Sequence, residues 1–409
     1  MAQAPSSPSI DERGAILLAQ RQRKMARSAH AYVRGATAKF YEWLETSAGR
    51  GLPEGPPVWI CGDCHLGNLG PVASADGDIE IQIRDLDQTV IGNPAHDLIR
   101  LGLSLATAAR GSDLPGVTTA KMLEEMMAGY HFALSDASAA GDDASDARAE
   151  PHVVRQALKR AAGRRWRHLA SERIVDPRPE IPMGKTFWKL TGPERGELKS
   201  LFASEEVRGM VTALKSRDDD APVEVRDAAY WIKGCSSLGR LRYAVLLQVG
   251  NGGPADGAFC LVDVKEAVRA AAPSAPGAMM PHAYADRVVA GARALSPYLG
   301  ERMRAGRLLG RSVVLRELLP QDMKLEMEHL SIAEAMRAAH YLGAVVGRAH
   351  ARQMAGDART SWSAELDRRW PKGLDAPFWL WSSVVDLVAT HEAAYLEHCR
   401  RYVLAAQAA

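Results

Sequence analysis

Residues 58–70 read VWICGDCHLGNLG, and the stretch GDCHLGN within them brings together an acid, a histidine and an amide. An apolar run leads into this stretch, as a short buried strand would. Asp63 and Asn68 are five positions apart, so a single loop can present both side chains. Phosphoryl transfer needs a carboxylate that orients the attacking hydroxyl or accepts its proton, and hard oxygen ligands that hold Mg²⁺ on nucleotide phosphates. Asp63 and Asn68 could supply these functions.

A second acidic segment follows a predicted strand, because the sequence IEIQIRDLDQT carries Asp85 and Asp87. Further carboxylates shortly downstream of the loop are what a Mg²⁺-dependent transfer site would need, and they favour this interpretation. Two other interpretations stay open. Cys61, Cys64 and His65 could begin a zinc site, but no second CxxC or spaced histidine pair completes four ligands. The stretch could also be a tight turn at a strand end, whose polar side chains bond only the backbone.

GDCHLGN resembles the catalytic loop of the protein-kinase-like superfamily, especially its aminoglycoside and choline kinase branch, whose pattern is H-G-D-x-H-x-x-N. Residues 85–97, DLDQTVIGNPAHD, are similar to the metal-binding segment that follows in that branch. The one departure in the loop is Cys61, which stands where the branch has its first histidine. The resemblance implies a catalytic base at Asp63, Mg²⁺ ligands at Asn68 and Asp85, and a helix-start brace for the loop at Asp97. Asp87 could be an extra metal ligand or an exposed strand-end acid.

The glycine-rich turn and the lysine that precede the catalytic loop in ordinary kinases are missing from residues 1–57 and resemble segments found later in the chain. GCSSLG, between two strand-like runs, resembles the nucleotide-covering turn, in which small residues let backbone N–H groups approach phosphates. Lys265 in LVDVKEA resembles the strand lysine that pairs with the α- and β-phosphates. VVLREL resembles the strand that leads to the adenine-contacting hinge. The implied nucleotide-binding residues are Gly234, Ser236, Ser237, Gly239, Lys265, Glu317 and Leu318.

This order implies a circularly permuted chain, with the catalytic half first and the nucleotide-covering half second. The arrangement resembles the bacterial family called domain of unknown function 2252, over residues from about 25 to 355. A permuted order is compatible with one fold when the new termini lie at the surface. The predicted fold is therefore an α+β, protein-kinase-like, two-lobed fold with a large helical lobe and a small antiparallel β-rich lobe. The expected divisions are 1–222 and 320–409 for the helical lobe, and 223–319 for the β-rich lobe.

Four supporting residues have interpretations of their own. Arg34 could contact a phosphate or brace the loop, and His65 is expected to support it. Asp97 is explained by a helix N-cap alone, and His350 by packing at a helix end. The acid that pairs with Lys265 stays open, because the helix expected at 282–296 lacks the usual glutamate and offers only Asp286. The candidates that remain are Glu266, Glu301 and Glu317.

Periodicity predicts the elements that must position these residues. Strands are expected at 58–62 and 79–84, joined by an ADGD turn, and a hairpin, a third strand and a fourth at 311–318 follow from residue 223. Helices are expected at 11–48, 97–110, 118–135, 152–173, 282–296, 331–354 and 376–404. The segment 136–151 is polar and rich in small residues, so a loop is expected there.

Composition limits the function classes. The chain has 409 residues, of which 47% are apolar, and its 51 Lys and Arg nearly cancel its 49 Asp and Glu. A balanced charge gives no global field for nucleic acid, and the basic helix at 152–173 is better explained as a solvated face than as an RNA-binding stripe. Five cysteines are too sparse and odd for a disulfide framework. With no leader and no long apolar run, we expect a cytoplasmic protein without membrane or nucleic-acid partners.

The expected function is an ATP- and Mg²⁺-dependent phosphotransferase acting on a hydroxyl of an unknown acceptor. Only twelve residues separate Asp85 from Asp97, which is too few for the segment on which protein kinases dock peptides, so a small molecule is the expected acceptor. Three alternatives stay open. The same superfamily includes enzymes that transfer AMP to proteins, and the chain could instead be a nucleotide-binding regulator without turnover. The third is an RNA-binding protein that uses the helix at 152–173, whose binding would depend steeply on salt and not on ATP.

Overall fold

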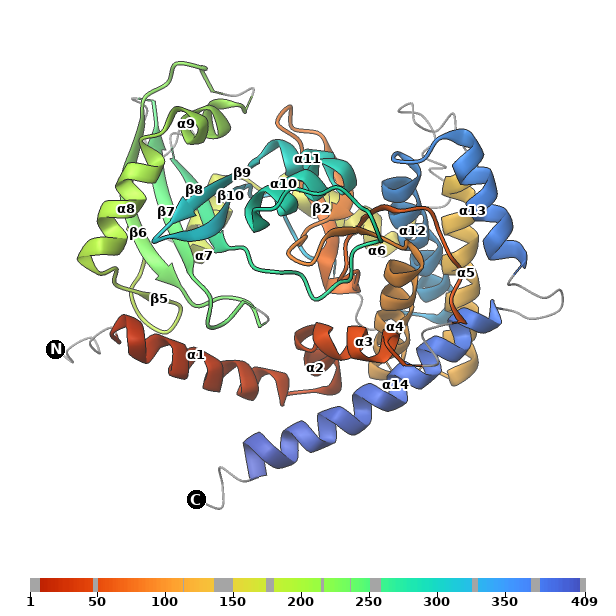
Figure 1. Ribbon diagram of the computed structural model, residues 1–409. Helices are drawn as coiled ribbons and strands as arrows, with labels where there is room; N and C mark the ends of the chain where they lie inside the picture. Colours follow the sequence, from red (N-terminus) through yellow and green to blue (C-terminus); the bar gives the residue numbers. More distant parts are fainter. Residues whose placement is uncertain are drawn as a thin grey trace.

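The computed structural model describes residues 8–46, 51–112, 114–135, 150–173, 180–214, 217–235, 237–250, 259–325, 330–368 and 376–404. A six-stranded antiparallel sheet, seen at the left of Figure 1, has the strand order β5-β6-β7-β8-β10-β9. Its strands are β5 (Phe187–Trp188), β6 (Val223–Trp231), β7 (Arg242–Val249), β8 (Phe259–Glu266), β9 (Met303–Leu308) and β10 (Arg311–Leu318). The expected antiparallel β-rich region is thus confirmed.

The two faces of β8 differ, because successive side chains of a strand point to opposite sides. Val262 and Val264 belong to a buried cluster that includes residues of α8 (Gly192–Phe202) and α9 (Glu205–Thr212). Asp263 and Lys265 therefore point to the opposite face, toward the rest of the molecule. The sheet includes β5, and α8 and α9 pack on it, so the sheet-bearing part of the chain begins before residue 223, where the sequence had placed its start.

The second part of the molecule is a group of helices at the right of Figure 1. Its centre is made by α4 (Ala95–Gly111), α5 (Gly116–Ser135) and α12 (Ile332–Ala351), with α13 (Gly356–Arg368) and α14 (Phe378–Cys399) outside them. The backbones of α5 and α12 approach very closely, since a Cβ at Gly129 would lie 1.9 Å from the carbonyl oxygen of His340. A larger residue at this position would force the two helices apart.

The N-terminal region forms three helices instead of the single one expected over 11–48: α1 (Ile10–Met25), α2 (Ala29–Gly35) and α3 (Thr37–Leu44). The apolar pattern runs through all three, but Ser28 caps α2 by accepting a hydrogen bond from the backbone N–H of Ala31, which starts a new helix. Leu17 of α1 packs in the same cluster as the sheet, and Tyr32 of α2 packs against Tyr395 of α14. This segment therefore lies along both parts of the molecule (Figure 1).

Two small two-stranded sheets connect the parts. β1 (Val58–Ile60) pairs with β4 (Val90–Gly92), and β2 (Leu69–Ala73) pairs with β3 (Ile79–Ile83). The ADGD turn thus joins β2 to β3, and the expectation that it joins the strands at 58–62 and 79–84 was wrong. A short 3₁₀ helix, η2 (Leu66–Asn68), separates β1 from β2. The other elements are α6 (His152–Gly163), α7 (Trp166–Arg173), α10 (Tyr284–Leu295), α11 (Pro297–Glu301) and the π-helical turn η4 (Arg400–Leu404).

The basic segment at 152–173 is two helices, α6 and α7, because the chain leaves helical geometry at Arg164, which caps α6 in an extended conformation. Nearly all of the loop expected at 136–151 lies outside the described residues. Of the helices that the structure describes, none combines the length and the apolar content needed to cross a lipid bilayer.

Candidate functional site

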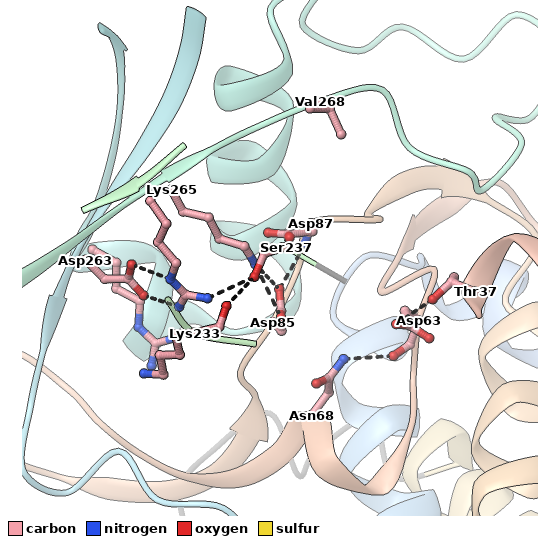
Figure 2. Close-up of polar contacts among 12 residues, drawn as sticks. Thr37, Asp63, Asn68, Asp85, Asp87, Lys233, Ser237, Asp263, Lys265 and Val268 are labelled. Carbon is pink, nitrogen blue, oxygen red and sulfur yellow. Dashed lines mark hydrogen bonds and ion pairs between the residues drawn. The ribbon is translucent and has the colours of Figure 1, made fainter. Parts of the chain in front are cut away.

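Lys265, near the end of β8, contacts the acids that follow β3. Its Nζ atom lies 3.3 Å from Oδ1 of Asp85 and also pairs with Asp87, although Lys265 and Asp85 are 180 positions apart in sequence. Figure 2 shows the three side chains converging between the sheet and the loop after β3. Burial alone would lower the pKa of Lys265, but the charges of Asp85 and Asp87 outweigh it and raise the pKa. The ammonium is therefore firmly charged.

This contact answers the question of which acid pairs with Lys265. Glu266 accepts hydrogen bonds from Arg311 and from the backbone N–H of Leu241, and Glu317 is paired with Arg217. The partners of Lys265 in the described part of the chain are instead the two acids expected to bind metal. The predicted approach of Lys265 to Asp85 is confirmed.

Asp85 and Asp87 behave differently as acids. Burial would raise the pKa of Asp85, but Lys265 and then Arg242 hold it well below its usual range. The pKa of Asp87 is raised, first by burial and then by the charge of Asp85. The Asp85 side chain is 41% exposed, whereas the Lys265 side chain is 14% exposed. Asp85 thus has the lower pKa of the two acids, and an incoming cation could reach its carboxylate.

Asp63 is held by two other side chains. Its Oδ1 accepts a hydrogen bond of 2.8 Å from Nε of Arg100, and its Oδ2 accepts one of 2.9 Å from the hydroxyl of Thr37. Nε2 of His65 lies 3.9 Å from Oδ2. Asp63 is buried, with 8% of its surface exposed, and Arg100 is fully covered. Each carboxylate oxygen has a second lone pair, so Asp63 can still accept a hydrogen bond from a ligand.

The loop around Asp63 is closed by its own residues. The amide Nδ2 of Asn68 donates to the backbone carbonyl of Asp63 at 3.0 Å, which leaves the amide oxygen without a hydrogen bond among the described residues. Gly62 has φ +72°, and a Cβ there would lie 2.3 Å from the carbonyl oxygen of Gln88. Both the left-handed backbone and the close contact require glycine. In Figure 2 the Asn68 side chain lies between Asp63 and the acids at 85 and 87.

Asp97 braces this loop, as the resemblance implied. Its carboxylate accepts the backbone N–H groups of Cys61 at 2.7 Å and Gly62 at 2.9 Å, and lies 3.3 Å from Nε2 of His350. The other ring nitrogen of His350 is 3.0 Å from the hydroxyl of Tyr130. The interpretation of Asp97 as a helix N-cap was wrong, because Pro94 occupies the N-cap of α4 and Asp97 lies in the first turn. His350 is a packed histidine near a helix end, as expected.

The turn at 234–239 lies beside Lys265. Gly234 and Gly239 have φ +88° and +94°, which glycine adopts without strain. The hydroxyl of Ser237 donates to the carbonyl of Lys233 and accepts from Arg242, which forms an ion pair with Asp263 (Figure 2). Lys24 of α1 donates to the carbonyl of Gly234 at 3.0 Å, so α1 helps to position the turn. The predicted residue Ser236 lies outside the described residues.

The end of β10 lines a cavity of about 450 Å³. Glu317 and Leu318 both contribute to its wall, together with Trp166, Phe259 and Cys260. The carboxylate of Glu317 is buried in an ion pair of 2.8 Å with Arg217, so this side chain is already satisfied. Any polar recognition by Glu317 would therefore have to use its backbone.

Sequence reasoning missed three residues that hold the predicted site. Arg100 and Thr37 bond Asp63, and Arg242 donates to Ser237 in the turn. Arg100 had a detectable signal, since it follows Asp97 by three positions on the same face of one helix. Thr37 had none, because nothing near it in sequence suggests a bond to Asp63. Arg34, which was expected to contact phosphate or brace the loop, lies against Gly67 in the loop.

The zinc interpretation finds no support in the thiols. Cys61 and Cys64 are both buried and free. A hydrogen bond that the Cys61 thiol donates to Cys64, followed by burial, raises the pKa of Cys61 well above its ordinary value, so it remains a thiol and not the thiolate that zinc requires. Within the described ranges, no group of three or more His, Cys, Asp or Glu side chains is placed to hold a metal ion. A Mg²⁺ site would need Asn68 beside Asp85 and Asp87, and that set stays a prediction.

No curated protein and no solved structure matches this chain. One family model does, and its description is "Uncharacterized protein conserved in bacteria (DUF2252)". The match covers residues 13–401, which is a longer stretch than the resemblance indicated. Because the match includes nearly all of the 409 residues, the chain belongs to this bacterial family.

Proposed function

We propose that this protein binds ATP with Mg²⁺ between the six-stranded sheet and the Asp63 loop, and transfers the γ-phosphoryl group to an acceptor hydroxyl. The observation that carries the proposal is the contact of Lys265 with Asp85 and Asp87. A strand lysine facing a pair of acids, next to a glycine-containing turn, is the arrangement that phosphate and cation binding would require. The contact does not arise from packing between residues that are neighbours in the chain, because Lys265 and Asp85 are 180 positions apart.

The proposed fold is a kinase-like one with permuted order. The strands β6, β7 and β8, the helix α10 and the strands β9 and β10 follow one another in the chain, and the sheet order brings β8 between β7 and β10. This is compatible with a nucleotide-covering lobe that comes second in the sequence. The cavity beside Glu317 and Leu318, at the end of β10, has a size suited to a nucleobase.

The residues present fit a divalent cation. Asp85 and Asp87 already enclose one positive group, the ammonium of Lys265, and the Asn68 amide oxygen has no partner among the described residues. Carboxylate and amide oxygens are the ligands that Mg²⁺ prefers. Mg²⁺ would be held by Asn68, Asp85 and Asp87 and would neutralise the nucleotide phosphates. Lys265 would then turn from the acids to the phosphates.

Asp63 would orient the acceptor hydroxyl. Arg100 and Thr37 fix its carboxylate, and the remaining lone pairs can accept the hydroxyl proton in a hydrogen bond. Such fixed positioning is the main contribution that a protein makes to phosphoryl transfer. The proton would leave the acceptor oxygen as the new O–P bond forms, with Asp63 as its first acceptor.

A nucleotide-binding regulator without turnover is the second candidate, and one observation favours it. Asp63 is 8% exposed and already paired with Arg100, a geometry that also suits a purely structural acid. A regulator would bind ATP·Mg²⁺ and leave it unchanged, so turnover separates the two candidates.

The test is incubation of the purified protein with Mg²⁺, a metabolite pool and ATP labelled in either the α- or the γ-phosphate. Transfer of the γ-label, and its loss in Asp85→Asn, is the expected result. A product that keeps the α-label would replace the proposal with AMP transfer. ATP binding without any labelled product would support the regulator, and no binding at all would remove the nucleotide from the proposal. Lys199→Met, an exposed change on α8, is the matched control.

A further inference from the structure

Three cations lie near one another beside the Asp63 loop. They are Arg34 at the end of α2, Arg84 just after β3, and Lys324 in the segment that follows β10. We call these three residues the Arg34 cluster. The three come from segments far apart in sequence, so the fold itself brings them together.

Arg34 lies directly on the loop. A Cβ at Gly67 would be 3.0 Å from Cζ of Arg34, so the guanidinium packs against the backbone one residue before Asn68. Nε of Arg34 is buried and has no hydrogen-bond partner, and no ion pair to Arg34 occurs within the described part of the chain. A buried donor without a partner is costly, and it points to a ligand that would satisfy it.

Lys324 is carried by a segment that runs alongside β2. The backbone N–H groups of Met323 and Leu325 donate to the carbonyls of Pro71 and Leu69, at 3.3 and 3.4 Å. Burial, followed by repulsion from Arg34 and Arg84, lowers the pKa of Lys324. Among the described residues Lys324 has no anionic partner.

Arg84 completes the group. It donates to the backbone carbonyl of Asp322 at 3.3 Å, while its Nε is buried without a partner. A buried Nε without a hydrogen-bond partner points to a ligand here, as it does at Arg34.

The nearby acids form their ion pairs with cations outside the Arg34 cluster, although Asp322 and Asp85 also offset part of the charge of Arg84. Asp63 is paired with Arg100, Asp85 with Lys265, and Asp322 with Arg302 and Arg316.

His65 provides a second sign that a polar ligand belongs here. It is 4% exposed, its Nδ1 is buried without a partner, and it lies close enough to Arg34 and Asp63 for both charges to affect it. Arg34 and Lys324 therefore have no ion-pair partner among the described residues, and a neutral imidazole with a spare nitrogen lies near Arg34.

We propose that the Arg34 cluster binds a phosphate or carboxylate group of the acceptor molecule, so that the substrate is an anionic hydroxyl compound. This inference rests on the proposed function, because it places the acceptor's hydroxyl at Asp63. The nucleotide is the less suitable source of the anion. Arg84 lines the pocket that Lys265 shares with Asp85 and Asp87, but Arg34 and Lys324 do not line it. The part of the cluster formed by Arg34 and Lys324 therefore lies outside that pocket, and Arg84 lies between the two sites.

Inorganic phosphate is the probe, and titration calorimetry in the presence of saturating ADP and Mg²⁺ is the measurement. Arg34→Met and Lys324→Met should each weaken phosphate binding about tenfold or more, which corresponds to the loss of one charge-assisted contact. Arg34→Lys should retain part of the affinity. Lys121→Met, an exposed change on α5, should leave it unchanged. Circular dichroism and the melting temperature show whether each variant is folded.

Equal phosphate affinity in the wild type and in both folded methionine variants would overturn the proposal. A second comparison separates the two sources of the anion. If Arg34→Met weakens ATP but not ADP, and leaves phosphate binding unchanged, the site belongs to the γ-phosphate of the nucleotide and the acceptor proposal fails. Phosphate binding needs no turnover, so a protein that binds phosphate at this cluster but transfers nothing would refute the proposed function and not the anion site.

Discussion

Removal of the Lys265 ammonium should convert the pair Asp85 and Asp87 into a site that responds to Mg²⁺ alone. In the wild type the ammonium contacts both carboxylates, so added Mg²⁺ must displace it. In Lys265→Met the two carboxylates face each other without compensation. The variant should therefore be less stable than the wild type in the absence of divalent cations, and Mg²⁺ should restore much of the difference.

The magnitude follows from the distance. Unit charges 3.3 Å apart attract by about 5 kcal/mol at an effective dielectric constant near 20. The Asp85 side chain is 41% exposed, so solvent screening and desolvation offset much of this attraction. We expect a net loss of about 2–3 kcal/mol, because Lys265 also compensates Asp87. For a chain of 409 residues, a loss of this size lowers the melting temperature by roughly 2–4 °C.

The assay is thermal unfolding with and without Mg²⁺, in the absence of nucleotide. At about ten times the dissociation constant, Mg²⁺ should return about 1.4 kcal/mol to Lys265→Met. The double variant Lys265→Met with Asp85→Asn should lose this increment, since a metal ligand is gone. Lys199→Met, on the exposed side of α8, should show neither effect. An equal Mg²⁺ response in the wild type and Lys265→Met would refute the reasoning.

Three more predictions concern other parts of the chain. Asp63→Asn leaves Arg100 a hydrogen-bond acceptor. In single-turnover assays this variant should lower turnover about 100-fold or more, with little change in ATP affinity. Unchanged turnover would contradict the role of Asp63. Trp166 lines the cavity beside Leu318, so Trp166→Phe should remove the change in tryptophan fluorescence that ATP causes. A fluorescence change that persists in this variant would exclude the cavity as the nucleobase site. Burial lowers the pKa of His391 from 6.5 to about 4, so its contribution to stability is complete above about pH 6.5 and is lost as the pH falls toward 4. Between pH 4 and 6.5, His391→Leu should reduce the slope of the unfolding free energy against pH by up to about 1.4 kcal/mol per pH unit. Denaturant unfolding at several pH values measures this slope. An unaltered slope would show that His391 does not titrate on unfolding.

The sequence predicted most successfully the features that lie within one short segment. The loop with Asp63 and Asn68 depends on residues close together in the chain, so its spacing carries the information. The bracing role of Asp97, which is 36 positions from Cys61, was implied by the resemblance. The approach of Lys265 to Asp85 was predicted because the resemblance assigned both residues to one cleft. Spacing alone could not have joined positions 180 residues apart.

The features that the sequence did not predict have a common physical cause. The pairing of β1 with β4, and not with β3, depends on tertiary packing, because strands of three residues carry almost no alternation. The break between α1 and α2 depends on a single serine cap within a continuous helical pattern. The bond between Thr37 and Asp63 joins positions with no local signature. In each case a contact distant in sequence, or one capping atom, decides between alternatives that local propensity leaves equal.

Two groups of buried charge in the site have different physical characters. Asp63 and Arg100 are almost fully covered, and breaking such a pair costs several kcal/mol, so this pair is a fixed element. Asp85 is half-exposed, and its lysine partner can be exchanged for a divalent cation at moderate cost. A ligand can therefore rearrange the side of the site that carries Lys265 without disturbing the Asp63 loop. If ATP·Mg²⁺ is the ligand, binding and chemistry are divided between these two groups, and substitutions at Lys265 and at Asp63 should separate them.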